Sequence, residues 1–128
     1  MATLHEQLDA MLALESGWDG YGADPTDPRI IAWAKDFIAY FEALERVKGV
    51  DRGVRVYPTR TGGVQIEWED TQFERELELN RDGSIGLLHI EKSTGVMREE
   101  SFPSGREAVA LGFLPSLGEI AAVFAGAA

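Results

Sequence analysis

The feature that most constrains the fold of this chain is a change in the spacing of its apolar residues. Between residues 28 and 47 apolar side chains recur every three to four positions, which is the period of an amphipathic α-helix. From residue 54 to residue 102 apolar and polar residues alternate instead, which is the period of strands with one buried face. One long helix followed by several strands predicts an α+β fold, with the helix packed across one face of an antiparallel sheet.

Capping signals place the ends of the helices. Asp27 is a favourable N-cap and Pro28 a favourable first helical residue, while Gly49 can close the C-terminal end of the long helix. A short N-terminal helix is expected to begin at Thr3, because Thr3 and Glu6 have the spacing of a capping box. Similar pairs near the C-terminus, followed by apolar residues at helical spacing, predict short helices in the tail as well.

Turn signals divide the strand region into a meander of four or five antiparallel strands. Asn80–Gly83 has the composition of a hairpin turn, and Gly62-Gly63 and Asp70-Thr71 mark two more turns. With the usual register of the hairpin at Asn80–Gly83, His89 falls opposite Arg75. The expected strands cover residues 54–57, 64–69, 73–79, 84–91 and 96–102.

Length and composition suit a single domain over residues 1–128. Apolar residues make up 45% of the chain and charged residues 27%, which is typical of a globular protein. A chain of 128 residues buries a sizeable core without disulfides, and this one has no cysteine, as is common in reducing compartments. The N-terminal segment lacks the pattern of a signal peptide, and no apolar stretch is long enough to cross a bilayer. We therefore expect a cytoplasmic protein without membrane contact.

The charge balance narrows the classes of partner. Acidic residues number 22 and basic residues 12, for a formal net charge of −10. This balance disfavours direct nucleic-acid binding, which needs a basic face. An acidic protein can instead bind a basic protein surface and compete there with nucleic acid, although net charge also serves solubility alone.

The acids concentrate in the second and third predicted strands and the turns beside them. Between residues 67 and 82 the chain carries seven acids and only two bases. With a tight turn at Asp70-Thr71, Glu67 would lie opposite Glu74, and like charges directly opposite one another destabilise a sheet. Folding does not require that arrangement, so we expect either a solvated face or a recognition surface for a basic partner. The residues assigned to that surface are Glu67, Glu69, Glu74, Glu76, Glu78 and Asp82.

The segment Gly17-Trp18-Asp19-Gly20-Tyr21-Gly22-Ala23 is a second candidate binding element. It lacks the Gly-Lys-Ser/Thr ending of a phosphate-binding loop, and a helix rather than a strand precedes it. The simpler interpretation is a structural loop, in which the glycines allow left-handed turns and the aromatic residues fold back on the core. Exposed aromatic residues on a rigid loop also anchor partners, so Trp18, Asp19 and Tyr21 are retained as partner-binding candidates.

The sequence offers little for catalysis, and we predict an absence of enzymatic activity, cofactor and metal. There is no cysteine nucleophile, no serine lies in a nucleophile-elbow sequence, and His5 and His89 are the only histidines. His89 is expected to be a partly buried, neutral structural residue. The pairs Glu67–Glu69 and Glu74–Glu76 could serve a hydrolase, but they fall on a sheet face rather than in a cleft.

Two segments are distinctive when taken together. One is the loop Gly17–Ala23, followed by a proline at position 25 and a helix. The other is Val56-Tyr57-Pro58-Thr59-Arg60-Thr61-Gly62-Gly63-Val64-Gln65-Ile66-Glu67-Trp68, followed by acidic alternating strands. Over residues 12–92 the chain thereby resembles a family of small, uncharacterised bacterial proteins, some of them carried on mobile elements. The resemblance implies no functional residue. Small acidic proteins of mobile elements are often antitoxins, immunity proteins or inhibitors of host defence.

These observations lead to one main functional hypothesis and two alternatives. The main hypothesis is a non-enzymatic acidic protein that acts as a DNA mimic and occupies the basic nucleic-acid site of another protein. Suitable targets are a bacterial immune effector, such as a CRISPR complex, and a toxin nuclease. The first alternative is a self-associating module, such as a homodimer, that uses Trp18, Tyr21 and the apolar tail Leu111–Phe124. The second is a hydrolase with a carboxylate pair.

Overall fold

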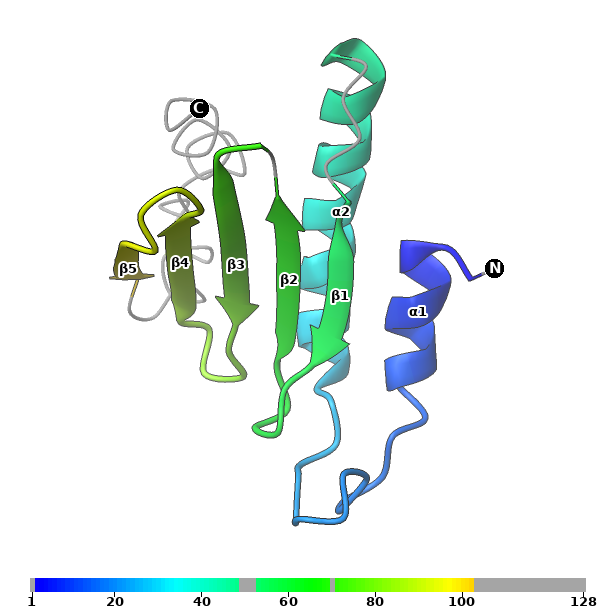
Figure 1. Cartoon of the computed structure of the whole chain (residues 1–128). Helices are drawn as coiled ribbons and strands as arrows, with labels where there is room; N and C mark the ends of the chain where they lie inside the picture. Colours follow the sequence, from blue (N-terminus) through cyan, green and yellow to red (C-terminus); the bar gives the residue numbers. More distant parts are fainter. Residues whose placement is uncertain (1, 49–52, 70, 103–128) are drawn as a thin grey trace.

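In the part of the chain that the structure describes, two helices and five strands follow one another (Figure 1). The computed structural model describes residues 2–48, 53–69 and 71–102. The helices are α1 (Leu4–Met11) and α2 (Pro28–Lys48), and the strands are β1 (Arg55–Pro58), β2 (Val64–Glu69), β3 (Phe73–Leu79), β4 (Ile85–Glu91) and β5 (Met97–Phe102). The strands form one antiparallel sheet in the order β1-β2-β3-β4-β5. The predicted α+β class and the antiparallel meander are therefore confirmed.

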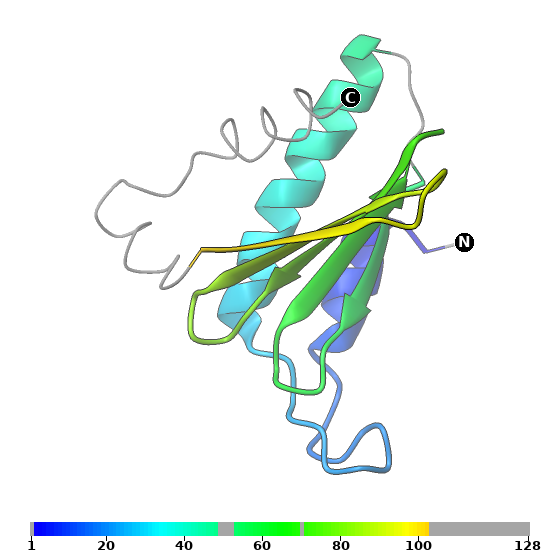
Figure 2. The same cartoon turned by 60° about the vertical axis from the view of Figure 1, so that its left-hand side comes forward.

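Both helices lie on the same side of the sheet, near β1 and β2 (Figures 1 and 2). α2 begins at Pro28 and has 21 residues; the carboxylate of Asp27, just before it, accepts a hydrogen bond from the Arg29 amide at 2.9 Å. α1 follows Thr3, where both hydrogen bonds of the predicted capping box are present. Because α1 contacts α2 and β1, it lies beside the β1 edge of the sheet.

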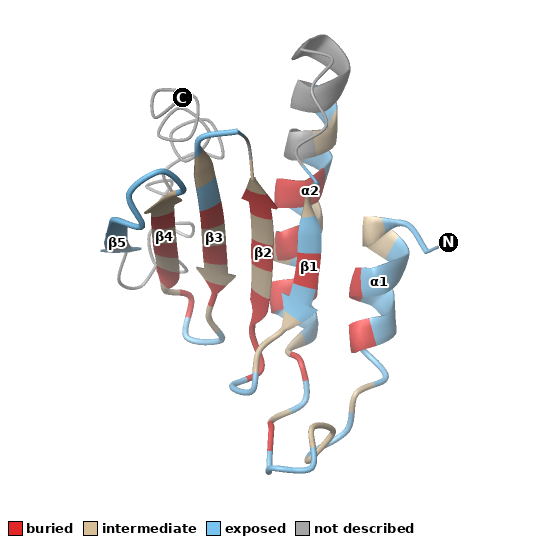
Figure 3. Ribbon diagram, viewed as in Figure 1, coloured by how far each residue is buried: buried red, intermediate tan, exposed pale blue. Residues whose placement is uncertain are grey.

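One face of the sheet and the facing sides of the helices form the core. Buried residues alternate with partly exposed ones along β2, β3 and β4 (Figure 3). Trp68, Ile66 and Leu77 are almost completely buried, in one cluster with Leu8 of α1 and Ile38 of α2. Because a slip of one residue would turn these side chains to solvent, their burial fixes which face of each strand points to the helices.

Two polar residues, Arg75 and His89, also lie on the buried side of the sheet. They are directly opposite one another on β3 and β4, as the hairpin signal predicted. Their exposed fractions are 2% and 8%, so His89 is more deeply buried than expected. The guanidinium carbon of Arg75 lies 5.0 Å from the centre of the Phe73 ring, which is the geometry of a cation–π contact.

The register between β2 and β3 differs from the predicted one. Glu67 pairs with Glu76 rather than with Glu74, and Glu74 pairs with Glu69. The prediction assumed a two-residue turn at Asp70-Thr71, whereas four residues, 70–73, separate the last strand pair. A shift of two residues leaves every side chain on its predicted face, so only the cross-strand partners change.

The C-terminal part of the predictions concerns residues that the structure does not describe. The short helices expected near the C-terminus and the apolar tail Leu111–Phe124 lie outside the described residues. Over the part of the chain that is described, neither helix is long and apolar enough to cross a membrane.

Candidate functional site

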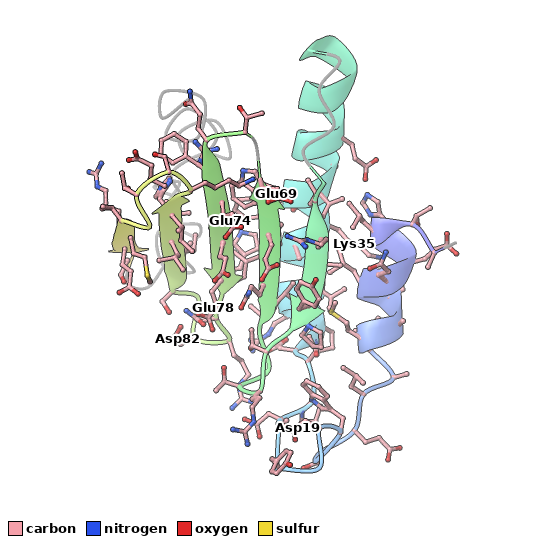
Figure 4. The ribbon with its side chains drawn as sticks, in the orientation of Figure 1. Asp19, Lys35, Glu69, Glu74, Glu78 and Asp82 are labelled. Carbon is pink, nitrogen blue, oxygen red and sulfur yellow. The ribbon has the colours of Figure 1, made fainter. Side chains whose placement is uncertain are left out.

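The face of the sheet that points away from the helices carries a cluster of glutamates. Since side chains alternate along a strand, the glutamates of β2 and β3 all point to this side, and one glutamate of β5 joins them. Figure 4 shows Glu69, Glu74 and Glu78 in front of the sheet, with α2 behind it. We call this surface the acidic face and define it by Glu67, Glu69, Glu74, Glu76, Glu78 and Glu99.

The pairing of β2 with β3 arranges five of these carboxylates as a ladder. From one end to the other, its rungs are Glu69–Glu74, Glu67–Glu76 and Gln65–Glu78. Successive rungs are two residues apart, which is about 6.8 Å along a strand. On the two rungs that hold a pair of carboxylates, two charges per 6.8 Å of strand amount to roughly one charge per 3.4 Å. That is the spacing of phosphate charges along one strand of B-DNA.

Of the basic side chains that the structure describes, those that pair with this ladder do so on its β2 side. Arg55 lies 3.6 Å from Glu67, and Lys92 lies 3.0 Å from Glu69. The β3 glutamates at positions 74, 76 and 78 have no Arg or Lys within ion-pairing distance among the described residues. Within the described ranges, the glutamates of the middle strand therefore have no ion pair that offsets their charge.

Two glutamates of the ladder, Glu76 on β3 and Glu69 on β2, have carboxyl pKa values shifted in opposite directions. Partial burial raises the pKa of Glu76, and the negative charges of its neighbours and a hydrogen bond to Glu67 raise it further. At the next rung, a hydrogen bond from Lys92 and its positive charge lower the pKa of Glu69. A raised carboxyl pKa means that the folded protein opposes the charge, so the ladder costs stability at Glu76.

The acidic face is hollowed beside Gly86, in the middle of β4. Gly86 lies between Glu78 of β3 and Ser101 of β5, and a depression of about 270 Å³ opens above it. We call this depression the Gly86 hollow. Its lining includes Gln65, Glu76, Glu78, Leu88, Glu99 and Ser101.

Sequence reasoning missed the part of the acidic face that β4 and β5 supply. Two signals were present: Gly86 stands in the middle of the strand Ile85–Glu91, and alternation along β5 puts Glu99 on the same face as Met97 and Ser101. To place both beside the β3 glutamates, however, the registers of two hairpins are needed together. Single-strand alternation gives a residue's face but not its neighbours.

Asp19, which was a candidate for partner binding, holds the loop Gly17–Ala23 together. Its carboxylate accepts hydrogen bonds from the amides of Tyr21 and Ala23 and pairs with Arg60 at 2.7 Å. Burial opposes ionisation of Asp19, but these hydrogen bonds and the charge of Arg60 outweigh it and lower the pKa of the carboxyl. Since Arg60 precedes β2, this ion pair joins the two segments that carry the family resemblance.

Trp18 is likewise engaged within the loop, whereas the Tyr21 side chain points to solvent. The indole N–H of Trp18 donates to the carbonyl of Asp24 at 2.8 Å. All three glycines of the loop have φ of +78° or +79°, a region that L-residues rarely adopt, as the structural interpretation predicted. Tyr21 is 81% exposed. Of the three loop candidates, Tyr21 is therefore the one available to a partner.

Asp82 lies apart from the acidic face, in the turn between β3 and β4 (Figure 4). Its carboxylate accepts hydrogen bonds from the hydroxyl and the amide of Ser84, at 2.6 and 2.8 Å, and these bonds lower the pKa of Asp82. The sequence grouped Asp82 with the strand glutamates, but its position and its bonds make it a cap of the turn.

The described acidic face offers negative charge on an open sheet surface. Within the described ranges, no cluster of three or more His, Asp or Glu side chains could hold a metal ion. The pairs considered for a hydrolase, Glu67–Glu69 and Glu74–Glu76, each lie along one strand of an open face. Glu76 does combine a raised pKa with a concave surface, but the hollow is smaller than the roughly 300–1,000 Å³ of small-molecule sites.

No protein-family model, curated protein or solved structure matches this chain. The resemblance based on the loop and on β2 therefore stays a prediction. Function is argued from the acidic face, the Gly86 hollow and the exposed loop.

Proposed function

We propose that this protein is a non-enzymatic inhibitor that uses its acidic face to occupy a basic, nucleic-acid-binding surface of another protein. The observation that carries the proposal is the ladder of opposed glutamates on β2 and β3. Directly opposed like charges destabilise a sheet, and solubility requires only dispersed charge. A face that keeps such pairs, with no ion pair to the β3 glutamates among the described residues, suits a partner that supplies the cations.

The mechanism would be substitution of carboxylates for phosphates. The three rungs extend over about 14 Å, which corresponds to about four phosphate intervals along one DNA strand. Lysine and arginine side chains placed to bind a nucleic-acid backbone would meet carboxylates at a similar charge spacing. Such binding falls steeply with salt concentration, because most of its strength comes from exposed charges.

The proposed partner is a protein that handles nucleic acid, such as a bacterial nuclease-based immune effector or a toxin nuclease. The formal net charge of −10 supports a basic protein partner over nucleic acid itself, because phosphates would be repelled. Occupation of the site would exclude the nucleic acid sterically and electrostatically, without any chemical step.

The test is capture of the partner on the immobilised protein from an extract of native host cells, at low and at high salt. The expected result is a basic nucleic-acid-binding protein that is retained at low salt, released at high salt, and displaced by added double-stranded DNA. The variant Glu74→Gln/Glu76→Gln/Glu78→Gln removes the three glutamates of β3 without changing side-chain size. It should lose the partner and remain folded.

A matched control removes three negative charges elsewhere. Glu15→Gln/Asp36→Asn/Glu42→Gln changes the same formal charge on the loop after α1 and on α2, and it should capture the partner as the wild type does. If the β3 variant still captured the partner normally, or if both triple variants lost it equally, the acidic face would not be the binding surface.

A second candidate function is self-association through the loop Gly17–Ala23. The observation that favours it is the exposure of Tyr21 on a loop that the Asp19–Arg60 pair holds in place. In that case sedimentation velocity would show an oligomer that persists at high salt and dissociates in Tyr21→Ser. A monomer in both proteins at all protein concentrations tested would reject this candidate.

A further inference from the structure

Gly86 is a glycine that its strand does not require. Glycine weakens a strand, and within one it usually marks a bulge, a sharp bend or a close approach of another group. The pairing of β4 with both neighbours runs through Gly86 without a bulge. The turn glycines have positive φ values, and Gly86 does not. Backbone geometry therefore gives no reason for glycine at this position.

Packing within the described chain gives no reason either, as a comparison with Gly63 shows. A Cβ on Gly63 would overlap the carbonyl oxygen of Leu79, so only glycine fits there. A Cβ on Gly86 would meet the side chain of Glu78 at 3.7 and 3.8 Å, which is ordinary van der Waals contact. Among the described residues, the reason that remains for a strand glycine is the close approach of another group.

The chemistry around Gly86 indicates what that group is. Strands β3 and β5 flank β4 and lie about 9.6 Å apart, at twice the spacing of neighbouring strands. β3 contributes Glu76 and Glu78 on one side of the hollow, and β5 contributes Glu99 and Ser101 on the other. Leu88 supplies an apolar patch beside the glycine. An apolar floor between walls of carboxylates fits a cation that is carried on a hydrocarbon stem.

We infer that the Gly86 hollow receives one arginine side chain of the basic partner. This inference rests on the proposed function and names the contact on which the partner would be anchored. A guanidinium can donate to the carboxylates of both walls at once, and it sheds water more easily than an ammonium does. Its stem would lie over Leu88 and Gly86. The volume of about 270 Å³ suits one side chain rather than a cofactor.

The protonation behaviour of the wall is consistent with a cationic occupant. Glu76 has a raised pKa because burial and its acidic neighbours oppose its charge. A guanidinium between the walls would reverse that effect and favour the charged carboxylate. Binding of the occupant should therefore release protons near the pKa of Glu76 and weaken as the pH falls.

The test is a titration of the full chain with acetylated, amidated tetra-arginine, followed by amide proton–nitrogen correlation NMR at low salt. The peptide should shift the Gly86 and Ser101 amides in a saturable manner. Tetra-lysine carries the same charge, and it should bind about tenfold more weakly because the hollow fits a fork of donors.

Two variants separate the hollow from the charge of the face. Gly86→Val fills the hollow, keeps every carboxylate and introduces a residue that favours strands, so it should weaken tetra-arginine binding about tenfold or more. Glu74→Gln removes one charge outside the hollow and should weaken binding by about twofold. Gly86→Ala is the milder form of the first variant, for use if valine impairs folding.

The outcomes distinguish this inference from the proposed function. Loss of binding in Gly86→Val, with an arginine preference in the wild type, supports the arginine site. Normal binding in Gly86→Val, together with loss in the triple β3 glutamine variant, overturns the arginine site and leaves the acidic face standing. Normal binding of tetra-arginine in Gly86→Val and in the triple β3 glutamine variant overturns both the arginine site and the acidic face as a binding surface. Equal affinity for tetra-lysine and tetra-arginine also overturns the arginine assignment.

Discussion

Replacement of Glu76 by glutamine should stabilise this protein at neutral pH. Glu76 lies directly opposite Glu67, and Glu74 and Glu78 lie beside it on the same face of β3. A like-charge pair directly opposed in a sheet costs about 0.2–1 kcal/mol. Glutamine keeps the size of the side chain and can still donate a hydrogen bond to Glu67. We therefore expect the free energy of unfolding to rise by roughly 0.5–1 kcal/mol, or about 2–6 °C in thermal midpoint for a domain of this size.

The pH dependence of this effect has a definite sign. The pKa of Glu76 is raised in the folded protein above its ordinary value of 4.5, so the folded state holds the proton more tightly than the unfolded chain does. Wild-type stability at this site is therefore full below about pH 4.5 and falls as the pH rises through the folded pKa. The advantage of Glu76→Gln should vanish in acid and reach its full size near neutrality.

Glu69 provides a matched control on the same face. Its pKa is lowered, chiefly by the hydrogen bond and charge of Lys92, so its ionised form stabilises the folded protein. Glu69→Gln removes the same formal charge but should lower stability near neutral pH, and its effect should fade as the pH falls through the folded pKa. Equal signs for the two substitutions would contradict the electrostatic account.

Urea unfolding monitored by circular dichroism measures both effects, at about pH 7 and about pH 4. Each pH is repeated at about 0.1 M and 1 M salt, where the Debye length falls from roughly 10 Å to 3 Å. The gain from Glu76→Gln should shrink at high salt. If Glu76→Gln destabilised the protein at neutral pH and low salt, the opposed glutamates would not be a cost to the fold, and the main support for a recognition surface would be lost.

Three further predictions concern the glycines and the loop. Gly63→Ala should lower the free energy of unfolding by about 1–3 kcal/mol or more, because its Cβ would overlap a β3 carbonyl, whereas Gly86→Ala should raise it by about 0.5–1 kcal/mol in the same denaturation assay. Arg60→Ala should speed limited proteolysis within residues 17–23, because Asp19 loses the ion pair that ties the loop to the segment before β2; an unchanged cleavage rate would show that the hydrogen bonds inside the loop suffice. Tyr21→Ser should change stability by less than about 0.5 kcal/mol, since the side chain is 81% exposed; a larger loss would reveal a packing role.

The sequence predicts a side chain's face more reliably than its cross-strand partner. Val64, Ile66 and Trp68 alternate with polar residues, and this alternation alone places them in the core. The hairpin at Asn80–Gly83 has a strong turn signal, and the pairing of His89 with Arg75 followed from it. The turn after β2 carries no comparable signal, so its length, and with it the partner of each glutamate, was misjudged by two residues.

The loop shows the same limit for candidate site residues. The glycines of Gly17–Ala23 predicted left-handed turns, and the structure has them. Whether Asp19 served a partner or the loop depended on Arg60, which lies 41 positions away in the sequence. A contact over that distance requires the sheet and the loop to be placed together, and no local pattern supplies it. Tyr21 remains a candidate because its side chain is exposed to solvent rather than packed in the fold.

The acidic face unites two features that each lower stability without serving the fold. Glu76 faces a like charge, and Gly86 leaves a strand without a side chain where one would fit. Both line the same hollow, with Glu78 and Glu99 beside them. Natural sequences depart from local folding rules chiefly at functional sites, so the coincidence of the two features at one place argues for a shared purpose. A partner's arginine would explain both, because it needs the space that Gly86 leaves and the charge that Glu76 carries. The two substitutions should therefore behave alike: each should stabilise the free protein and weaken its binding of arginine.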